Sequence, residues 1–156
     1  MLNDITIRPF QDEDSPALKD LIVTDLLEIN VHDYGQAVAE QMAAAYNDDL
    51  IAHYALNAVV FMAVKEEQIV GTAGLQADRV RNVFTHKDYQ RQGIGRRLMA
   101  AIEDAARRQG QTRLWLRASL SAVGFYGHLG YQIVEEREEQ VGQSIIKMVR
   151  MQKELD

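Results

Sequence analysis

A tight turn between an expected strand and an expected helix constrains the fold of this chain more than any other feature. The turn reads Gln90-Arg91-Gln92-Gly93-Ile94-Gly95, between Val83-Phe84-Thr85 and a helical run from Arg96 to Arg108. A helix N-terminus carries unpaired N–H groups and a partial positive charge, so it attracts a phosphate. Glycines at alternate positions let an anion reach the backbone without meeting a side chain. The turn is therefore predicted to hold a pyrophosphate.

Two better-known phosphate loops do not fit this spacing. A Walker loop needs Gly, four residues and then Gly-Lys followed by Ser or Thr, and no such string occurs in the chain. A dinucleotide fingerprint needs a third glycine where Leu98 stands, and an acid about 20 residues on, where Arg113 stands. The remaining pattern, Gln/Arg-x-x-Gly-x-Gly after a strand, resembles the signature of the GNAT N-acetyltransferase superfamily.

A second segment, residues 119–131, carries the same resemblance. It is similar to the later motif of that superfamily, which runs Asn-x-x-Ala-x-x-aromatic/Leu-Tyr-x-x-Leu-Gly-Phe/Tyr. The positions that match are Ala122, Tyr126, Leu129, Gly130 and Tyr131. Ser119 stands where the motif usually has Asn. Two motifs in this order are stronger evidence than either alone, and the resemblance extends from Ile5 to Met151.

The resemblance implies an acetyl-CoA site. In that superfamily the amides of the turn bind the pyrophosphate of coenzyme A. The strands before and after the following helix lie parallel and splay apart, and the pantetheine arm sits between them. The strand before the turn is then expected to pair its backbone with the pantetheine amides, like an added strand. The cofactor-binding residues so implied are Val83, Phe84, Thr85, Gln90, Arg91, Gln92, Gly93, Ile94, Gly95, Arg96, Ser119 and Tyr126.

Tyr126 is the expected general acid of an acyl transfer. A phenol has a pKa of about 10 and a thiol of about 8.5, so Tyr126 is protonated at neutral pH and can hydrogen-bond the departing sulfur. The alternative is that Tyr126 only packs in the sheet with its hydroxyl satisfied. The resemblance also places a backbone N–H near Val83 against the thioester oxygen, and one such donor contributes roughly 2.7–4 kcal/mol.

The sequence leaves the general base unassigned. Many members of the superfamily carry Glu on the strand before the turn, and the comparable position here is Arg79. Asp78 is adjacent and is the second catalytic candidate, although strand alternation can direct it to the other face. His86 has a suitable unperturbed pKa, but a capping or exposed role is expected on that turn. A water chain, or an acceptor amine of low pKa, would remove the need for a base.

The order of elements predicts one α/β domain over residues 1–156, with a mixed central sheet of about 6–7 strands and helices on both faces. A helix is expected from Asp14-Ser15-Pro16, with Asp14 as its cap. Residues 48–57 form either a short helix or a loop. Two glycines in the strand 69–75 suggest a bulge or the close approach of another chain or a ligand. The expected strands are residues 5–8, 59–64, 69–75, 78–85, 113–117, 131–136 and 143–151.

Composition removes several chemistries. The chain has no cysteine, which excludes disulfides, thiolate metal sites and an acyl-cysteine intermediate, so direct transfer is the simplest route. No metal is expected, because the four histidines share no metal-binding spacing. No apolar run of about 18 residues occurs, and Met1-Leu2-Asn3-Asp4 lacks a basic n-region, so neither a membrane span nor a secretory signal is expected. A cytoplasmic protein is predicted.

The net charge of −6 argues against nucleic acid as the main partner, because phosphate neutralisation needs a basic surface. Arg91, Arg96 and Arg97 are expected to supply a local cationic site for coenzyme A. The acidic remainder either aids solubility or suits a cationic amine acceptor.

The leading prediction is an acetyl-CoA-dependent N-acetyltransferase acting on a primary amine, either a small molecule or a peptide. The alternatives are a coenzyme A-binding sensor or partner subunit without turnover, and a nucleic-acid patch at the turn. Asn30-Val31-His32-Asp33-Tyr34 is expected to line the acceptor pocket. The sequence does not identify the acceptor, and it leaves a homodimer through an exposed strand edge open.

Overall fold

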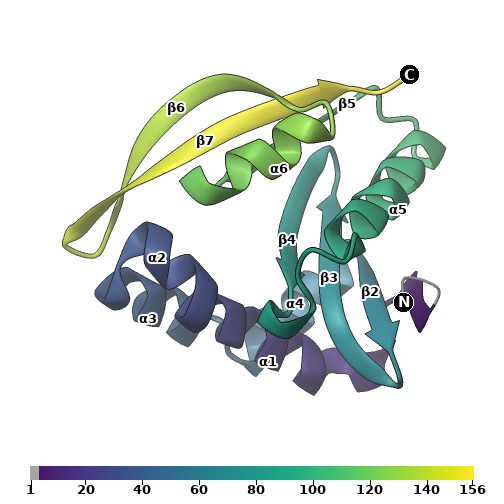
Figure 1. Cartoon of the computed structure of the whole chain (residues 1–156), viewed down its shortest axis with the longest axis horizontal. Coiled ribbons are helices and arrows are strands. Elements are labelled where there is room, and N and C mark those ends of the chain that lie inside the picture. Colours follow the sequence, from purple (N-terminus) through teal and green to yellow (C-terminus); the bar gives the residue numbers. More distant parts are fainter. Residues whose placement is uncertain (1–3) are drawn as a thin grey trace.

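The computed structural model describes residues 4–156, so residues 1–3 of the predicted domain lie outside it. Seven strands form one sheet in the order β1-β2-β3-β4-β5-β7-β6 (Figure 1). All neighbouring pairs are antiparallel except β4 and β5, which are parallel. The predicted mixed sheet is confirmed. The strands are β1 (Ile5–Pro9), β2 (Val59–Lys65), β3 (Gln68–Gln76), β4 (Arg79–Thr85), β5 (Arg113–Ala118), β6 (Gln132–Val141) and β7 (Ser144–Glu154).

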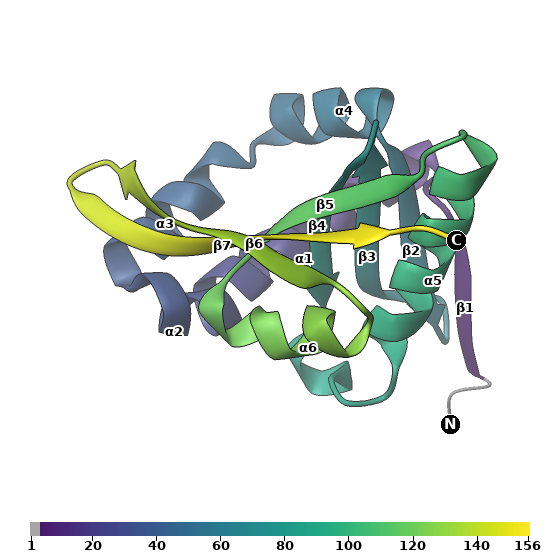
Figure 2. The same cartoon turned by 90° about the horizontal axis from the view of Figure 1, so that it is seen from above.

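Helices cover both faces of the sheet (Figure 2). α5 and α6 lie over one face, where Leu98 and Ile102 are fully buried. α1, α3 and α4 lie over the other, where Leu18, Ile22 and Met62 are fully buried. Burying each such side chain contributes about 1.5–3 kcal/mol. The helices are α1 (Ser15–Asp25), α2 (Val31–Tyr34), α3 (Gln36–Ala45), α4 (Asp48–Asn57), α5 (Ile94–Arg108) and α6 (Val123–His128).

The segment 48–57, open between helix and loop, is the helix α4. Asn47 caps it, because its side-chain oxygen accepts a hydrogen bond from the Leu50 N–H at 2.9 Å. Asp48 and Asp49 lie in the first turn, where the helix dipole favours negative charge. Local capping therefore decides the conformation of this segment.

The predicted start of α1 is confirmed, with Asp14 at the N-cap and proline in the first turn, but the Asp14 side chain makes no capping hydrogen bond to the helix. Its two carboxylate oxygens accept from the Arg8 guanidinium at 2.7 and 2.9 Å. A bidentate pair of this kind is charge-assisted and outcompetes a neutral cap. The carboxylate also accepts from the Gln11 N–H, so it ties β1 to the start of α1.

The two glycines of β3 have packing roles. A Cβ at Gly71 would lie 2.9 Å from Ile94 Cγ2 on α5, and a Cβ at Gly74 would overlap the Tyr54 hydroxyl on α4. The register with β4 also shifts between Thr72 and Gly74. The expected bulge is confirmed. The groups that approach the glycines are side chains of the same chain, and not another chain or a ligand.

The end of α1 leads into the site. Residues 26–30 form one π-helical turn, which passes directly into α2. Such turns are rare and often occur at functional positions. The β6–β7 hairpin extends from the sheet toward α2 and α3 (Figure 1). It is linked to α2 by the Tyr34 hydroxyl, which donates to Met148 Sδ at 3.4 Å. No helix within residues 4–156 is both long and apolar enough to cross a membrane.

Candidate active site

The turn before α5 has the backbone expected of an anion cradle. Gly93 has a φ of 79° and is the N-cap of α5. The Arg97 N–H donates to Gly93 O at 3.1 Å. The N–H groups of Ile94, Gly95 and Arg96 precede that bond, so they have no acceptor within the helix. Glycine is required at residue 93 because the left-handed conformation is costly for other residues.

Gly95 has a second role that the sequence did not reveal. A Cβ at this position would lie 3.0 Å from Phe125 Cζ on α6. The absent side chain therefore lets α6 pack against the first turn of α5. Gln90 lies five residues after the end of β4, and its side-chain amide donates a hydrogen bond to Thr85 O at 3.4 Å.

The cation set at the turn is smaller than expected. Arg91 and Arg96 are exposed. Arg97 instead directs its guanidinium to β1, where it donates to Ile5 O at 2.7 Å. It therefore helps to hold α5 on the sheet, and the expected contribution of Arg97 to the phosphate site is corrected to a structural one.

Strands β4 and β5 part immediately after they meet. Their parallel pairing has one register pair, Arg79 with Trp115. The Trp115 N–H also donates to Asp78 O at 3.0 Å. Beyond this point no further register pair joins the two strands, so they diverge. The splay that the resemblance implied is present.

A bulge on β4 lies beside this divergence. The register with β3 passes from Arg81 opposite Gly74 to Phe84 opposite Thr72, and skips Asn82 and Val83. Asn82 has a φ of 53°. A bulge of this kind re-aims the backbone and interrupts strand pairing. The predicted pantetheine-binding residues Val83, Phe84 and Thr85 lie at and just after it.

A cavity of about 290 Å³ lies between the diverging strands and the β6–β7 hairpin. Of the predicted site residues, four line it: Val83, Phe84, Ser119 and Tyr126. The other lining residues come from the π-helical turn, α2, α3, both strands, the segment after β5 and the hairpin. They are Leu26, Asn30, Tyr34, Met42, Tyr46, Arg79, Val80, Arg81, Asn82, Leu116, Arg117, Ala118, Ala122, Glu139, Val141, Ile146 and Met148.

The expected acceptor segment, residues 30–34, contributes Asn30 and Tyr34 to the lining. Asp33 fixes the same segment, because its carboxylate accepts from the backbone N–H and the hydroxyl of Ser121 at 3.1 and 2.6 Å. The two ends of the cavity wall, α2 and the segment after β5, are thereby held together.

Tyr126 is almost fully buried on α6, with an exposed fraction of 8%. Its ring packs edge-on against Phe125 and Tyr131, with centroids 5.0 and 5.9 Å away. Burial raises the pKa of the Tyr126 phenol well above its usual value, and Tyr34 adds to the effect. The hydroxyl is therefore a hydrogen-bond donor throughout the neutral range, and it is too weak an acid to give up its proton to water.

The candidate bases lie differently. Asp78 is not among the residues that line the cavity. Its carboxylate accepts from Trp115 Nε1 at 3.0 Å, which fastens β5 to the start of β4. His86 Nδ1 accepts from the Asp88 N–H at 3.1 Å and caps the short helical turn there, as expected. Glu139 is the carboxylate that lines the cavity, and it is ion-paired with Arg117.

Several cavity residues were not found from the sequence. Arg79 was noted only as a replacement for Glu, and Arg81, Arg117 and Glu139 were not singled out. They alternate along their strands, which places them on one face of the sheet. That alternation is the only local signal of their position. Within residues 4–156 no group of three or more histidine, aspartate or glutamate side chains is arranged to hold a metal ion.

Known proteins share the fold of this chain. A family model described as "Acetyltransferase (GNAT) domain" matches residues 29–155. The chain belongs to the GNAT acetyltransferase family. An uncharacterised protein of Bacillus subtilis, YyaT, is 30% identical over 94 residues, which are 58% of this chain and 62% of that protein. The match thus spans less than two thirds of that relative's length.

Two solved structures have the same fold. The first is a GCN5-related N-acetyltransferase from Rhodopseudomonas palustris, whose description also reads "Aminotransferase, Class-II". It is 24% identical, covers 96% of this chain and 95% of its own, and has a TM-score of 0.89. The second is the PaiA N-acetyltransferase of Thermoplasma acidophilum in complex with coenzyme A. It is 15% identical, covers 96% of this chain and 98% of its own, and has a TM-score of 0.78.

Proposed function

We propose that this protein transfers the acetyl group of acetyl-CoA directly to a primary amine. One observation carries the proposal: β4 and β5 diverge beside the cradle and open a cavity that Tyr126 also lines. Family membership and the coenzyme A complex of the PaiA relative support the same ligand. Acetyl-CoA, when bound, supplies the acetyl group as an activated thioester.

The residues present fit such a ligand. The free N–H groups at the start of α5 suit a pyrophosphate, with Gln90, Arg91, Gln92 and Arg96 around them. Strand β4 pairs with β5 at a single register position, so the later backbone groups on that edge are left for amides that enter the gap as an added strand. Val83, Phe84 and Thr85 would hold the arm, and Ser119 would line the opposite wall.

In the proposed reaction the amine forms the new N–C bond as the C–S bond breaks, and Tyr126, the expected general acid, acts by donating a hydrogen bond to the departing sulfur. Its raised pKa keeps the proton on the phenol, so Tyr126 stabilises developing negative charge on sulfur. The backbone N–H near Val83 is the proposed donor to the carbonyl oxygen. The cavity would hold the amine close to its target, and well-oriented reactants gain about 7–11 kcal/mol from proximity.

We propose that solvent water takes the proton from the acceptor amine, and Asp78 is the lesser candidate for the general base. Asp78 is engaged by Trp115 and does not line the cavity. The lining carboxylate, Glu139, is neutralised by Arg117. Deprotonation of the acceptor through water is consistent with these contacts.

The paired state of Glu139 also favours one rival: a coenzyme A-binding sensor or partner subunit without turnover. Thiol release from acetyl-CoA in the presence of a panel of primary amines separates the two. Release that depends on both the protein and an amine supports the transferase. Tight binding of acetyl-CoA with no release for any amine supports the sensor.

We further propose a cytoplasmic site of action, where acetyl-CoA is available. The sheet ends in β1 and β6, and either edge offers backbone groups for a homodimer. Sedimentation of the purified protein across a range of concentrations tests that assembly.

A further inference from the structure

Five arginines from four strands gather on one side of the cavity. Arg79 and Arg81 belong to β4, Arg117 to β5, Arg137 to β6 and Arg150 to β7. Arg117 and Arg150 are direct register partners, so their side chains leave the sheet on the same face. We call these five residues the arginine cluster.

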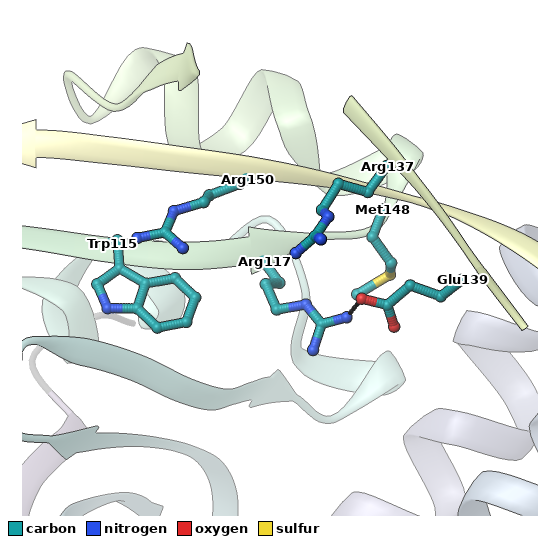
Figure 3. Close-up of a pocket in the computed structure, with 6 residues that line it drawn as sticks. All are labelled: Trp115, Arg117, Arg137, Glu139, Met148 and Arg150. Carbon is teal, nitrogen blue, oxygen red and sulfur yellow. Dashed lines mark ion pairs between the residues drawn. The ribbon is translucent and has the colours of Figure 1, made fainter. Parts of the chain in front are cut away.

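The cluster lines two adjoining hollows. Arg79, Arg81 and Arg117 line the cavity of about 290 Å³ that also contains Tyr126. The other members join Arg117 around a second hollow of about 120 Å³. Figure 3 shows the guanidinium groups of Arg117, Arg137 and Arg150 around this second hollow, with Trp115 beside them. The two hollows share Arg117, Glu139 and Met148.

Carboxylates balance only part of this positive charge. Glu139 is ion-paired with Arg117, and the exposed Arg137 lies 3.5 Å from a carboxylate oxygen of Glu135. Arg81 donates to the neutral side chain of Gln76 at 2.7 Å. The chain as a whole carries a net charge of −6, so this local excess of cations runs against its overall charge.

The remaining two arginines lie against Trp115. The guanidinium carbon of Arg79 lies 4.9 Å from the centroid of the Trp115 ring, and that of Arg150 lies 4.0 Å away. Stacking on an aromatic face holds a guanidinium in place without neutralising it. Both groups are thus fixed and remain charged.

Two buried donors on the cavity wall lack acceptors. Arg79 Nε and Asn82 Nδ2 are buried with no hydrogen-bond partner among residues 4–156. Both residues line the larger cavity. Burial lowers the pKa of Arg79, and the neighbouring charges of Arg81, Arg117 and Arg150 lower it further. An anion bound at this place would accept hydrogen bonds from both unpaired donors and would reduce the repulsion among the arginines.

We propose that the acceptor of the acetyl group is a small amine that also carries an oxyanion, either a carboxylate or a phosphonate-type group. The arginine cluster holds this oxyanion, and the amine points toward Tyr126. The proposal rests on the transferase function proposed above. Arg81 precedes Val83 by two residues and Arg79 by four, which is roughly 7 and 13 Å of strand. The amine and the oxyanion therefore lie several bonds apart. This assignment replaces the cationic acceptor that the acidic composition had suggested.

The same cations help the chemistry. An amine must lose a proton before it attacks, and nearby positive charge lowers the pKa of its ammonium form. The arginine cluster therefore favours the reactive neutral amine. This is consistent with a cavity whose lining carboxylate, Glu139, is already paired.

The first test is a matched set of primary amines of equal chain length that end in a carboxylate, a phosphonate, a carboxamide or a second ammonium. With saturating acetyl-CoA, kcat/KM should be about tenfold or more higher for the two oxyanions than for the other two. The comparison of carboxylate with phosphonate decides between the two oxyanions. A higher kcat/KM for the diamine or the carboxamide would overturn the proposal.

Variants locate the effect. Arg150→Gln, and separately Arg79→Gln, should raise KM for the oxyanionic amines about tenfold more than KM for the carboxamide amine. Arg113→Gln is the matched control. Arg113 lies on the same strand as Arg117, pairs with Glu154 at 2.6 Å and is exposed, outside both hollows. Equal effects of all three variants on all four amines would overturn the assignment to the cluster.

A second readout does not need turnover. Trp115 is the one tryptophan of the chain and contacts both Arg79 and Arg150. Titration of the carboxylate amine without acetyl-CoA should change its fluorescence saturably, with weaker affinity in Arg150→Gln and unchanged affinity in Arg113→Gln. A saturable fluorescence change with no acetyl transfer to any amine would refute the transferase function and support the oxyanion site. Acetyl transfer to diamines with no fluorescence change on addition of the carboxylate amine would refute the oxyanion site and support the transferase function.

Discussion

Replacing Tyr126 by phenylalanine isolates one hydroxyl group in the proposed reaction. The ring stays packed against Phe125 and Tyr131, because the substitution removes only an oxygen. Tyr126 is 8% exposed, and its phenol is held in the protonated form by burial. The variant therefore loses a hydrogen-bond donor and keeps the shape of the cavity wall.

The expected loss of activity follows from the negative charge that develops on the departing sulfur, which accepts the hydrogen bond from Tyr126. A hydrogen bond to a charged group contributes about 1.5–3 kcal/mol. Each 1.36 kcal/mol in activation free energy is tenfold in rate, so kcat should fall by roughly 10- to 150-fold. The dissociation constant of coenzyme A should change by less than about threefold, because the hydroxyl acts on the sulfur during transfer. Thiol release gives kcat, and calorimetry gives the dissociation constant.

Tyr131→Phe is the matched control. Its hydroxyl donates to the buried Glu103 at 2.9 Å, and it is not among the residues that line the cavity. This variant should lose stability by about 1.5–3 kcal/mol while keeping its kcat. A kcat within threefold of wild type for Tyr126→Phe, or an equal fall in both variants, would refute the role assigned to Tyr126.

Three further perturbations have defined outcomes. Burial, with Glu28 nearby, raises the pKa of Asp25 from 3.8 to about 7. The contribution of Asp25 to stability is therefore fully present below about pH 4 and is lost as the pH rises to about 7. Asp25→Asn should therefore have about the stability of wild type near pH 4 and exceed it by on the order of 1–4 kcal/mol at pH 8 in thermal melts, and a gain independent of pH contradicts this. Gly93→Ala, at a φ of 79°, should lose about 1–2 kcal/mol of stability in urea unfolding and weaken coenzyme A binding, whereas unchanged binding argues against the cradle. Gly74→Ala should lose about 1–3 kcal/mol by overpacking against Tyr54, and a second substitution, Tyr54→Leu, should recover part of the loss.

The parts of the fold that local signals encode were predictable. Gly93 marks the start of α5 because only glycine takes that backbone conformation cheaply. The alternation of β1 and the apolar run of β2 identified two strands of the sheet. The glycines of β3 signalled both the register shift between β3 and β4 and the close approach of neighbouring side chains.

The parts that depend on distant partners were not predictable. Asp14 reads as a helix cap until Arg8 is placed beside it. Arg97 reads as a phosphate ligand until β1 supplies Ile5 O. The arginine cluster comes from four strands that are far apart along the chain, so only the sheet order β4-β5-β7-β6 brings it together. No local pattern states which residues will share a cavity.

Calorimetric titration of the wild-type protein with acetyl-CoA, repeated on Gly93→Ala, tests most directly whether the turn after β4 holds the pyrophosphate. We predict saturable binding of one acetyl-CoA molecule per chain, and a clearly larger dissociation constant in the variant. Absence of heat with both acetyl-CoA and coenzyme A, together with no rise in melting temperature, would contradict the account.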